Sequence, residues 1–505
     1  MLKLVGEYLK RPSFWAVAFF IVLVVGTALH LSTLTFSPVA WLDEVQIIEI
    51  AQGGVGEKTS GWSMCFPARP EYQGRAWAVY YLGGALNELA YQSFGVWGPR
   101  SASLLGLVLS AILLFWYVHR RSRDGMFAFA ISNCFFSLPC VTQSVRGARV
   151  DIWPVFCLFL GLHILLGAKS RRKCGWAVSY FCAGFLSVTG CFFWAVGAFL
   201  LPIYVWGFFC EFPKPFRQIR EWLTPAALAI MGALIGVVIW LIPFYGDLGL
   251  TFEMAQWISS FNSNSPTCHN ICSAWRGFVG FSTSFPFLCL IGFIVILFVR
   301  GQWWLKIGLI VMTVVCVVVA ARIYVFRFVY FSTFAVLGAL MVSVWKNERR
   351  MLYRTIRLAL VILSLAACCI SVVLRNGVEF LARKGRSYSI LHETLLRAVG
   401  RNVNVYTTSF EVYYAGRELG WKMFCAPIGG DADPLLIGWE KIDCVLCPFD
   451  ASDSAIDFYR SKGFSVREVV SVPPPAYSEW ERWILSRAHK KVESGPYIVL
   501  KRANG

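Results

Sequence analysis

Residues 13–31 read SFWAVAFFIVLVVGTALHL, an apolar run with no acidic residue, lysine or arginine. A run of this length matches the roughly 20 residues that a helix needs to cross the hydrocarbon core of a bilayer. Lys3, Lys10 and Arg11 precede it, and because basic residues stay on the cytoplasmic side, we expect a cytoplasmic N-terminus. The run lacks a convincing small-residue cleavage site, so we interpret it as a retained helix and not as a signal peptide.

The composition extends this interpretation to the whole chain. Of the 505 residues, 57% are hydrophobic and only 15% are charged, and the mean hydropathy is +0.59. A soluble domain could not hide so much apolar surface, so the sequence predicts an integral membrane protein in contact with lipid. Much of the net charge of +18 comes from lysine and arginine in short loops assigned to the cytoplasm, which indicates membrane topology and not a nucleic-acid-binding patch.

Similar apolar runs recur along the first 374 residues and predict a mainly α, polytopic transmembrane helix bundle of about eleven spans. The expected spans are residues 13–31, 101–118, 125–141, 152–167, two within 176–209, then 223–243, 285–299, 307–321, 328–345 and 358–374. Residues 32–99 form a large first outer loop with two expected interfacial helices, at 38–52 and 76–94. The apolar residues of the first recur at helical spacing, and the second carries aromatic side chains suited to headgroup depth.

From residue 375 onward the composition changes to that of a soluble domain. Segments with strand character alternate with helical patterns, which predicts a small C-terminal α/β domain over residues 375–505 on the extracytoplasmic side. The expected strands are 404–408, 423–427, 443–448, 465–472 and 497–501, and the expected helices include 454–462 and 479–490. The chain therefore divides into a membrane domain, residues 1–374, and a tail that we expect to help recognise an acceptor or a partner.

Two adjacent carboxylates, Asp43 and Glu44, lie just beyond the first span, where the predicted topology makes them extracytoplasmic. Near the membrane surface, either one can act as a general base toward an acceptor hydroxyl if a donor with a good leaving group is held nearby. A phosphate is such a leaving group, and cations stabilise the charge that develops on it.

Suitable cations stand at the outer ends of later spans, at Arg146, Arg149 and Arg327. A guanidinium group can bind a lipid phosphate through two hydrogen bonds, and Asp151 can orient these arginines or the acceptor. Acids and arginines at span ends also solvate the membrane interface without any further role. Their occurrence together at matching outer ends favours a site.

In this arrangement the chain resembles the polytopic GT-C glycosyltransferases, in particular the bacterial branch related to protein O-mannosyltransferases and lipid A aminoarabinose transferases. The residues that carry the resemblance are Asp43-Glu44, Tyr80-Tyr81, Phe94-Gly95, Pro99-Arg100, the run from Arg146 to Asp151, and Arg327-Phe328 at the start of a late span. A soluble domain after the last span is a further shared feature.

The resemblance implies an inverting enzyme of the bacterial inner membrane that transfers a hexose or pentose from a polyprenyl-phosphate donor to an extracytoplasmic lipid, glycan or protein acceptor. It implies that Asp43 is the catalytic base, with Glu44 in support. It also implies that the donor phosphate is bound by arginines, here Arg146, Arg149 and Arg327, with Asp151, Tyr80 and Tyr81 in supporting roles.

The chain departs from this family at one position and leaves other functions open. Where many relatives carry a Lys-Gly pair after span five, this chain has Thr189-Gly190-Cys191, so one expected phosphate contact is missing or replaced. No nucleotide loop, metal-spaced His/Cys set or other cofactor motif is present, and a divalent cation stays open as an added component. A transporter or flippase would carry ionisable residues in mid-span and repeated halves, whereas a non-catalytic envelope scaffold would tolerate loss of Asp43.

Two cysteine pairs fall outside the predicted spans. Cys268 and Cys272 lie in an outer loop, where an oxidising compartment would allow a disulfide. Cys444 and Cys447 have the spacing of a redox dithiol, but they fall within a predicted strand, so we interpret them as structural residues.

Overall fold

The computed structural model of the chain describes residues 12–36, 44–45, 47–48, 81–168, 173–212, 219–249, 252–253, 333, 350–424, 438–472, 476–488 and 494–502. The chain forms two compact units. The membrane unit comprises residues 1–29, 78–83 and 102–374, and the loop–tail unit comprises residues 30–77, 84–101 and 375–505. One division falls after residue 374, and most of the first outer loop belongs with the tail.

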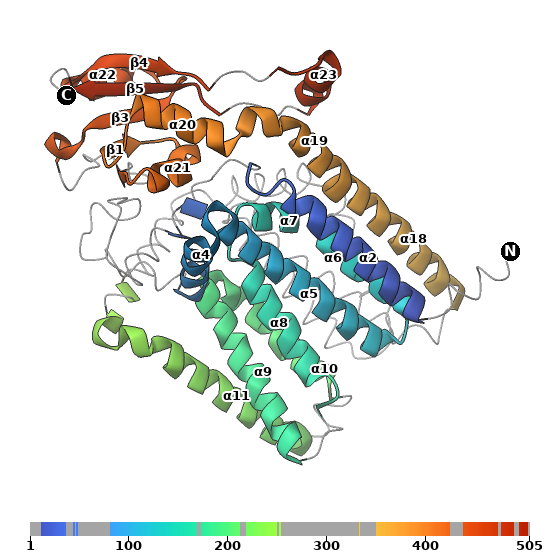
Figure 1. Ribbon diagram of the computed structural model, residues 1–505. Helices are drawn as coiled ribbons and strands as arrows, with labels where there is room; N and C mark the ends of the chain where they lie inside the picture. The colour runs from blue at the N-terminus through green and yellow to red at the C-terminus, as the bar shows by residue number, and fades with distance from the viewer. Residues whose placement is uncertain are drawn as a thin grey trace. The chain divides into compact units, whose positions relative to one another are not determined.

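The membrane unit is built of apolar helices that follow the predicted spans (Figure 1). They are α2 (Pro12–Leu31, of which residues 12–29 belong here), α5 (Gly98–Ser122, of which residues 102–122 belong here), α6 (Gly125–Ser137), α7 (Pro139–Arg146), α8 (Ile152–Leu165), α9 (Lys173–Phe193), α10 (Leu201–Cys210), α11 (Ile219–Leu241) and α18 (Arg350–Cys368). A 3-10 segment, Ala195–Leu200, joins α9 to α10, and a π-helical turn, Cys369–Leu374, follows α18. The predicted spans at 285–299, 307–321 and 328–345 lie outside the described residues.

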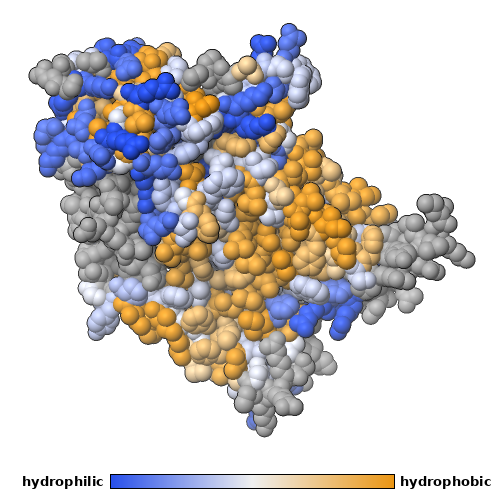
Figure 2. Space-filling model, in the orientation of Figure 1, coloured by the Kyte–Doolittle hydropathy of each residue, from blue (hydrophilic) through white to orange (hydrophobic). Residues whose placement is uncertain are grey.

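The outward faces of these helices are apolar. Within the part of the chain that the structure describes, five helical runs are long and apolar enough to cross a membrane. Large exposed hydrophobic side chains include Val24 on α2, Leu234 on α11 and Ile362 on α18, and Figure 2 shows hydrophobic residues gathered over this unit. Exposing so many large apolar side chains to water would cost much free energy, so these faces lie against lipid, and the chain is a multi-pass membrane protein.

Close backbone approach holds α9 against α11, which lie side by side in Figure 1. A Cβ atom added at Gly184 would collide with the carbonyl oxygen of Ala229, and one at Gly232 would collide with that of Phe181. Two glycines, one on each helix, therefore allow the two backbones to touch. Small residues at such contacts are typical of helix packing in lipid, where dispersion contacts replace the hydrophobic effect as the main attraction.

Polar contacts join α6 to α18, although more than 200 residues separate them along the chain. The amide of Asn133 donates a hydrogen bond to the carbonyl of Ser364 at 3.0 Å. Asp124 caps the N-terminus of α6 through the Phe127 N–H, and its second oxygen pairs with the Arg357 guanidinium at 2.7 Å. One carboxylate therefore satisfies a helix terminus and fixes α18 against it.

The loop–tail unit combines an α/β domain with parts of the first outer loop. Its helices are α4 (Tyr81–Phe94, of which residues 84–94 belong here), α19 (Arg375–Ala382), α20 (Tyr388–Ala398), α21 (Tyr413–Glu418), α22 (Asp453–Ser461) and α23 (Glu479–Arg487). Its strands are β1 (Asn404–Thr407), β2 (Lys422–Phe424), β3 (Cys444–Pro448), β4 (Phe464–Val470) and β5 (Tyr497–Arg502). The predicted α/β tail is confirmed.

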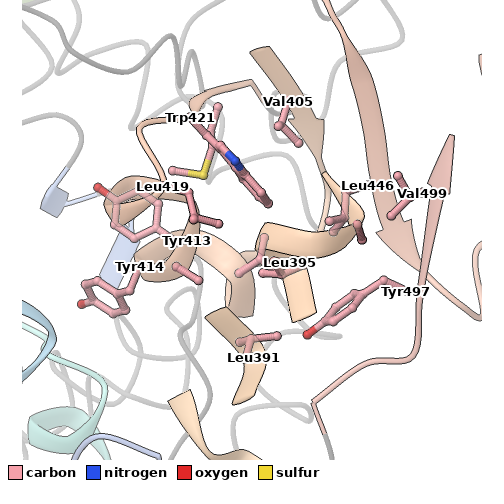
Figure 3. Close-up of a cluster of buried hydrophobic side chains, with 14 of the residues drawn as sticks. Leu391, Leu395, Val405, Tyr413, Tyr414, Leu419, Trp421, Leu446, Tyr497 and Val499 are labelled. Atoms are coloured by element: carbon pink, nitrogen blue, oxygen red, sulfur yellow. The ribbon is translucent and has the colours of Figure 1, made fainter. Parts of the chain in front are cut away.

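The five strands form one mixed sheet in the order β2-β1-β3-β5-β4. Strand β1 is parallel to β2 and β3, whereas β5 is antiparallel to β3 and β4. Alternate residues of each strand point to opposite faces, so Val405 and Leu446 pack with α20 and α21 on one side, while Tyr406 and Val445 pack with α22 on the other. Figure 3 shows the first of these two cores.

Candidate functional site

A buried ionic cluster holds Glu44, the second acid of the pair that follows the first span. Arg100 donates two hydrogen bonds to the Glu44 carboxylate, from Nε to Oε1 and from Nη2 to Oε2, each at 2.9 Å. The Tyr414 hydroxyl donates a third, at 2.5 Å, to Oε1. The remaining Arg100 nitrogen, Nη1, donates to the carbonyl of Leu34 at 2.7 Å. Three segments of the loop–tail unit thus meet at one carboxylate.

The residues next to Glu44 explain why this cluster is buried. Val45 and Ile48 are fully buried in the hydrophobic core that α20, α21 and the sheet build, the core drawn in Figure 3. Their spacing of three puts both side chains on one face of a helical turn. The sequence predicts that this face lies along the membrane interface; in the structure, the tail covers it. Burial of the apolar face carries the adjacent Glu44 into the interior.

The contacts of the cluster hold the Glu44 side chain in one orientation. Its side chain is 0% exposed and that of Arg100 is 2% exposed. A buried carboxylate is costly unless it is paired and hydrogen-bonded, and this one has both kinds of partner. Burial, and then the neighbouring Glu44 charge, raise the pKa of Tyr414 well above its ordinary value. Tyr414 therefore keeps its proton and remains a donor.

A second ion pair on the same short helix ties the tail to α4. Arg417 donates from both terminal nitrogens to Glu88, at 3.0 and 2.7 Å, and its guanidinium carbon lies 4.0 Å from the centre of the Tyr91 ring. Tyr91 in turn stacks on Tyr414, with ring centroids 5.7 Å apart. Hydrogen bonding to Glu88 raises the pKa of Arg417 in spite of its burial. Helix α21 thus holds Glu44 and Glu88 through two residues three positions apart.

In the membrane unit, the predicted phosphate-binding segment forms the turn between α7 and α8. Arg146 ends α7 and is fully buried, and Arg149 is also buried. The Arg149 Nε atom pairs with Asp151 Oδ2 at 2.7 Å, and the Ser103 hydroxyl donates to the Arg149 carbonyl at 3.1 Å. Asp151 does contact Arg149, as the sequence suggests, and fixes the direction of its guanidinium group.

The remaining predicted site residues are not all described. Asp43, Tyr80 and Arg327 lie outside the described residues, and so do Cys268 and Cys272. Tyr81 begins α4, but its side chain is not described. The structure therefore brings together Glu44 with Arg100 in one unit, and Arg149 with Asp151 in the other. Roles in catalysis and donor binding stay predictions for every residue of the proposed site.

Thr189, which stands where the family resemblance implies a phosphate contact, has a structural use here. The Thr189 hydroxyl donates to the carbonyl of Phe185 at 2.9 Å and accepts a hydrogen bond from the Trp240 ring nitrogen at 3.0 Å. Thr189 thus links α9 to α11. This polar contact adds to the glycine contacts between the same two helices.

Sequence reasoning missed three partners in the loop–tail unit. The sequence gives Arg100 no role beyond its place in the Pro99-Arg100 motif, and it singles out neither Tyr414 nor the Arg417–Glu88 pair. Arg100 follows Pro99 in the quoted family motif, which was a signal that it has a specific role. Nothing in the sequence near Tyr414 marks it, because its partner Glu44 lies 370 residues away.

Among the described residues of the tail, Cys444 and Cys447 are packed inside the sheet. Cys444 and Cys447 are buried in β3 with free thiols, and burial raises the pKa of Cys444 to about 12 and that of Cys447 to about 11. Thiols with such pKa values are poor nucleophiles at neutral pH. Among the described residues, no group of three or more His, Cys, Asp or Glu side chains could hold a metal ion.

Sequence comparisons find no matching protein-family model and no matching curated protein. Comparison with solved structures finds similar folds. The structure of ArnT from Cupriavidus metallidurans bound to undecaprenyl phosphate matches over 97% of this chain and 98% of its own, with a TM-score of 0.62 at 11% identity. The apo structure of the same protein matches with a TM-score of 0.56 at 12% identity over 96% and 98% of the two chains.

A more distant match is the archaeal oligosaccharyltransferase AglB from Archaeoglobus fulgidus, at 13% identity over 92% of this chain and 75% of that one. Its TM-score of 0.43 is too low to carry an argument. The likeness to ArnT spans nearly the whole of both chains, tail included, and at 11–12% identity it bears on the fold alone. The resemblance inferred from the sequence is thereby confirmed at that level: this chain has the GT-C fold of ArnT.

Proposed function

We propose that this chain is an inverting membrane glycosyltransferase that moves a sugar from a polyprenyl-phosphate donor to a lipid, glycan or protein acceptor. The reaction takes place on the extracytoplasmic side of a bacterial inner membrane, with the N-terminus in the cytoplasm and the tail outside. In this proposal Asp43 is the catalytic base. Arg146, Arg149 and Arg327 bind the donor phosphate, with Asp151, Tyr80 and Tyr81 in support.

The proposed step is a single displacement at the anomeric carbon. The Asp43 carboxylate removes the proton of the acceptor hydroxyl, and the acceptor oxygen forms a bond to the anomeric carbon. The bond from that carbon to the phosphate oxygen breaks, and its electron pair leaves with the polyprenyl phosphate. Attack from the face opposite the leaving group inverts the configuration. Guanidinium groups stabilise the charge that develops on the phosphate.

The observation that carries this proposal is the buried cluster around Glu44. Asp43 precedes Glu44 in the sequence, and a catalytic base must be held within hydrogen-bond reach of the proton that it removes. Two bonds from Arg100 and one from Tyr414 fix Glu44. Glu44 is buried and both of its carboxylate oxygens accept hydrogen bonds, so it suits a supporting role. We assign the role of base to the adjacent residue, Asp43.

The donor assignment has two supports. The sequence contains no glycine-rich nucleotide loop, which favours an activated sugar that arrives on a lipid. The structure of ArnT, which shares the fold, was solved bound to undecaprenyl phosphate. In this chain, Arg149 is held by Asp151 at 2.7 Å, which fixes the direction of its guanidinium group.

Replacing Asp43 by Asn tests the proposal, because it keeps the shape and removes the base. We expect transfer in lipid vesicles supplied with a polyprenyl-phosphate sugar to fall by about 10²–10⁴-fold. Glu44→Gln is the matched comparison, and we expect its loss of activity to be accompanied by a loss of stability. Normal transfer by Asp43→Asn together with an inactive but stable Glu44→Gln would reverse the two roles. Transfer from a nucleotide sugar alone would contradict the donor assignment.

A further inference from the structure

Helix α23 carries two tryptophans that remain largely exposed. Trp480 and Trp483 are 57% and 62% exposed, although tryptophan is among the side chains that gain most from burial. They lie three positions apart, and Arg487 follows four positions later, so all three project from one side of the helix. We call the surface made by Trp480, Trp483 and Arg487 the tryptophan face.

The other side of α23 is the one that holds the helix in the tail. Glu481 and Leu485 lie four positions apart, and both are buried. Glu481 forms a capping box with Ser478 and contacts the Lys384 ammonium at 3.1 Å. Because these contacts fix α23 from the inside, the exposed tryptophans are not what docks it onto the rest of the tail.

The tryptophan face combines apolar rings with positive charge. The Arg487 guanidinium carbon lies 5.6 Å from the centre of the Trp483 ring. Arg482 is also exposed, against the single exposed acid of the helix, Glu479. Tryptophan beside arginine suits the headgroup region of a bilayer, where the indole ring lies between water and hydrocarbon and the guanidinium group reaches a lipid phosphate.

Helix α19, which lies next to α23 in the same unit (Figure 1), shows the same combination. Phe380 is 45% exposed, and the Arg383 guanidinium carbon lies 3.6 Å from the centre of its ring. The hydroxyl of Tyr477, just before α23, donates a hydrogen bond to the Ala382 carbonyl at the end of α19, at 3.3 Å. Two helices in contact therefore each present an exposed aromatic ring with a guanidinium group against it.

The chain connection brings a bilayer within reach of these helices. Helix α19 begins at Arg375, the residue that follows the last predicted span, 358–374. A helix of eight residues is about 12 Å long, and Tyr477 contacts its far end at Ala382. This limit rests on the covalent chain and on contacts within the loop–tail unit, so it holds at any angle between the span and α19.

We propose that the tryptophan face is an interfacial anchor, which inserts into the headgroup region of a phospholipid bilayer and holds the tail at the membrane surface. Lipid is the occupant that fits, because rings and guanidinium groups together match a headgroup layer and because the chain connection supplies a bilayer within reach. Helices with aromatic and basic residues bind membrane surfaces in this way. The proposal goes beyond the proposed function, since it concerns attachment of the tail and does not depend on sugar transfer.

The test places a photoreactive residue on the face and identifies what it touches. Full-length protein with Trp483→p-benzoylphenylalanine is reconstituted in vesicles of phosphatidylcholine and phosphatidylglycerol and illuminated, and mass spectrometry identifies the adducts. We expect phospholipid adducts on the peptide that contains position 483. The control is Phe458→p-benzoylphenylalanine, because Phe458 is an aromatic residue of another tail helix, α22, and is 40% exposed; its yield of lipid adducts should be several-fold lower.

Two further variants assign the contributions of the face. Added to the position-483 protein, Trp480→Ser should lower the yield of lipid adducts several-fold. Arg487→Gln should lower the ratio of phosphatidylglycerol to phosphatidylcholine adducts by up to about fivefold, the effect of one basic residue near an anionic surface. Arg397→Gln, at an exposed arginine of α20, should leave that ratio unchanged.

If the position-483 protein does not fold, position 480 carries the photoreactive residue instead. Adducts with a second protein chain in place of lipid would overturn the proposal in favour of a protein-binding surface. Equal yields of lipid adducts at positions 483 and 458, or a yield that Trp480→Ser leaves unchanged, would also overturn it.

Discussion

Replacing Tyr414 by Phe removes one oxygen atom from the Glu44 cluster and should destabilise the loop–tail unit. The lost hydrogen bond is short, at 2.5 Å, and its acceptor is charged and buried. Hydrogen bonds to charged groups contribute about 1.5–3 kcal/mol. The ring itself stays, with its stacking on Tyr91, so no large cavity opens to add to this cost. Glu44 keeps both bonds from Arg100, so the variant should fold.

Hydrogen exchange of the full-length protein measures this loss. The amides of β3 lie in the centre of the sheet, where exchange requires the unit to open, so a loss of about 1.5–3 kcal/mol should accelerate their exchange by about 10- to 150-fold. Tyr245→Phe is the control, since Tyr245 is 85% exposed and the same change there should alter stability by less than about 0.5 kcal/mol.

The specific contact is separated from general packing by combining Tyr414→Phe with Glu44→Gln. If the hydroxyl acts on the carboxylate, the double variant should lose at least about 1 kcal/mol less than the sum of the single losses, because the second change removes a contact already broken. Additive losses, or exchange in Tyr414→Phe at the wild-type rate, would refute the reasoning.

Three further predictions concern the tail. Hydrogen bonds from the Ser478 amide and hydroxyl, and then from Lys384, lower the pKa of Glu481 below its ordinary value of 4.5. The contribution of Glu481 to stability is therefore present above pH 4.5 and is lost as the pH falls through the lower pKa of the folded state. Replacing Glu481 by Gln should flatten the acid limb of a profile of thermal stability against pH. Burial raises the pKa of Cys444 to about 12 and that of Cys447 to about 11, so iodoacetamide at neutral pH should alkylate both thiols only after denaturation. Rapid labelling of the folded protein, detected by mass spectrometry, would contradict this prediction. Removal of residues 375–505 uncovers Val45 and Ile48, so limited proteolysis should cut near residues 44–48 in the truncated chain and spare them in the full chain.

The sequence predicted those parts of the fold that depend on local patterns. Apolar runs placed several of the described spans within a few residues, as in α11 at Ile219–Leu241 against the expected 223–243. Alternation placed the strands equally well, as in β3 at Cys444–Pro448. Both patterns reflect the environment of a single segment, lipid in one case and the two faces of a sheet in the other, so no knowledge of distant residues was needed.

The candidate site was less predictable because its contacts join distant segments. The helical spacing of Val45 and Ile48 showed that one face of the turn must be covered, but this spacing does not show whether lipid or protein covers that face. In the structure, the tail covers it. The same limit hid the role of Arg100, because an arginine at a predicted span end is a topology signal until its carboxylate partner is known.

Helix α21 links these observations. Tyr414 and Arg417 lie three positions apart, so both project from one face of the helix, and each binds a carboxylate on a different part of the first outer loop: Glu44 and Glu88. The loop carries the pair of acids, whereas the tail carries the groups that fix the loop. The α/β fold of the tail therefore determines where Glu44 stands, and under the proposed function it also restricts the position of Asp43. Under the proposed function, the tail therefore supports the catalytic loop as well as helping to recognise the acceptor, because without it the loop loses the apolar core and the Tyr414 and Arg417 contacts that hold it.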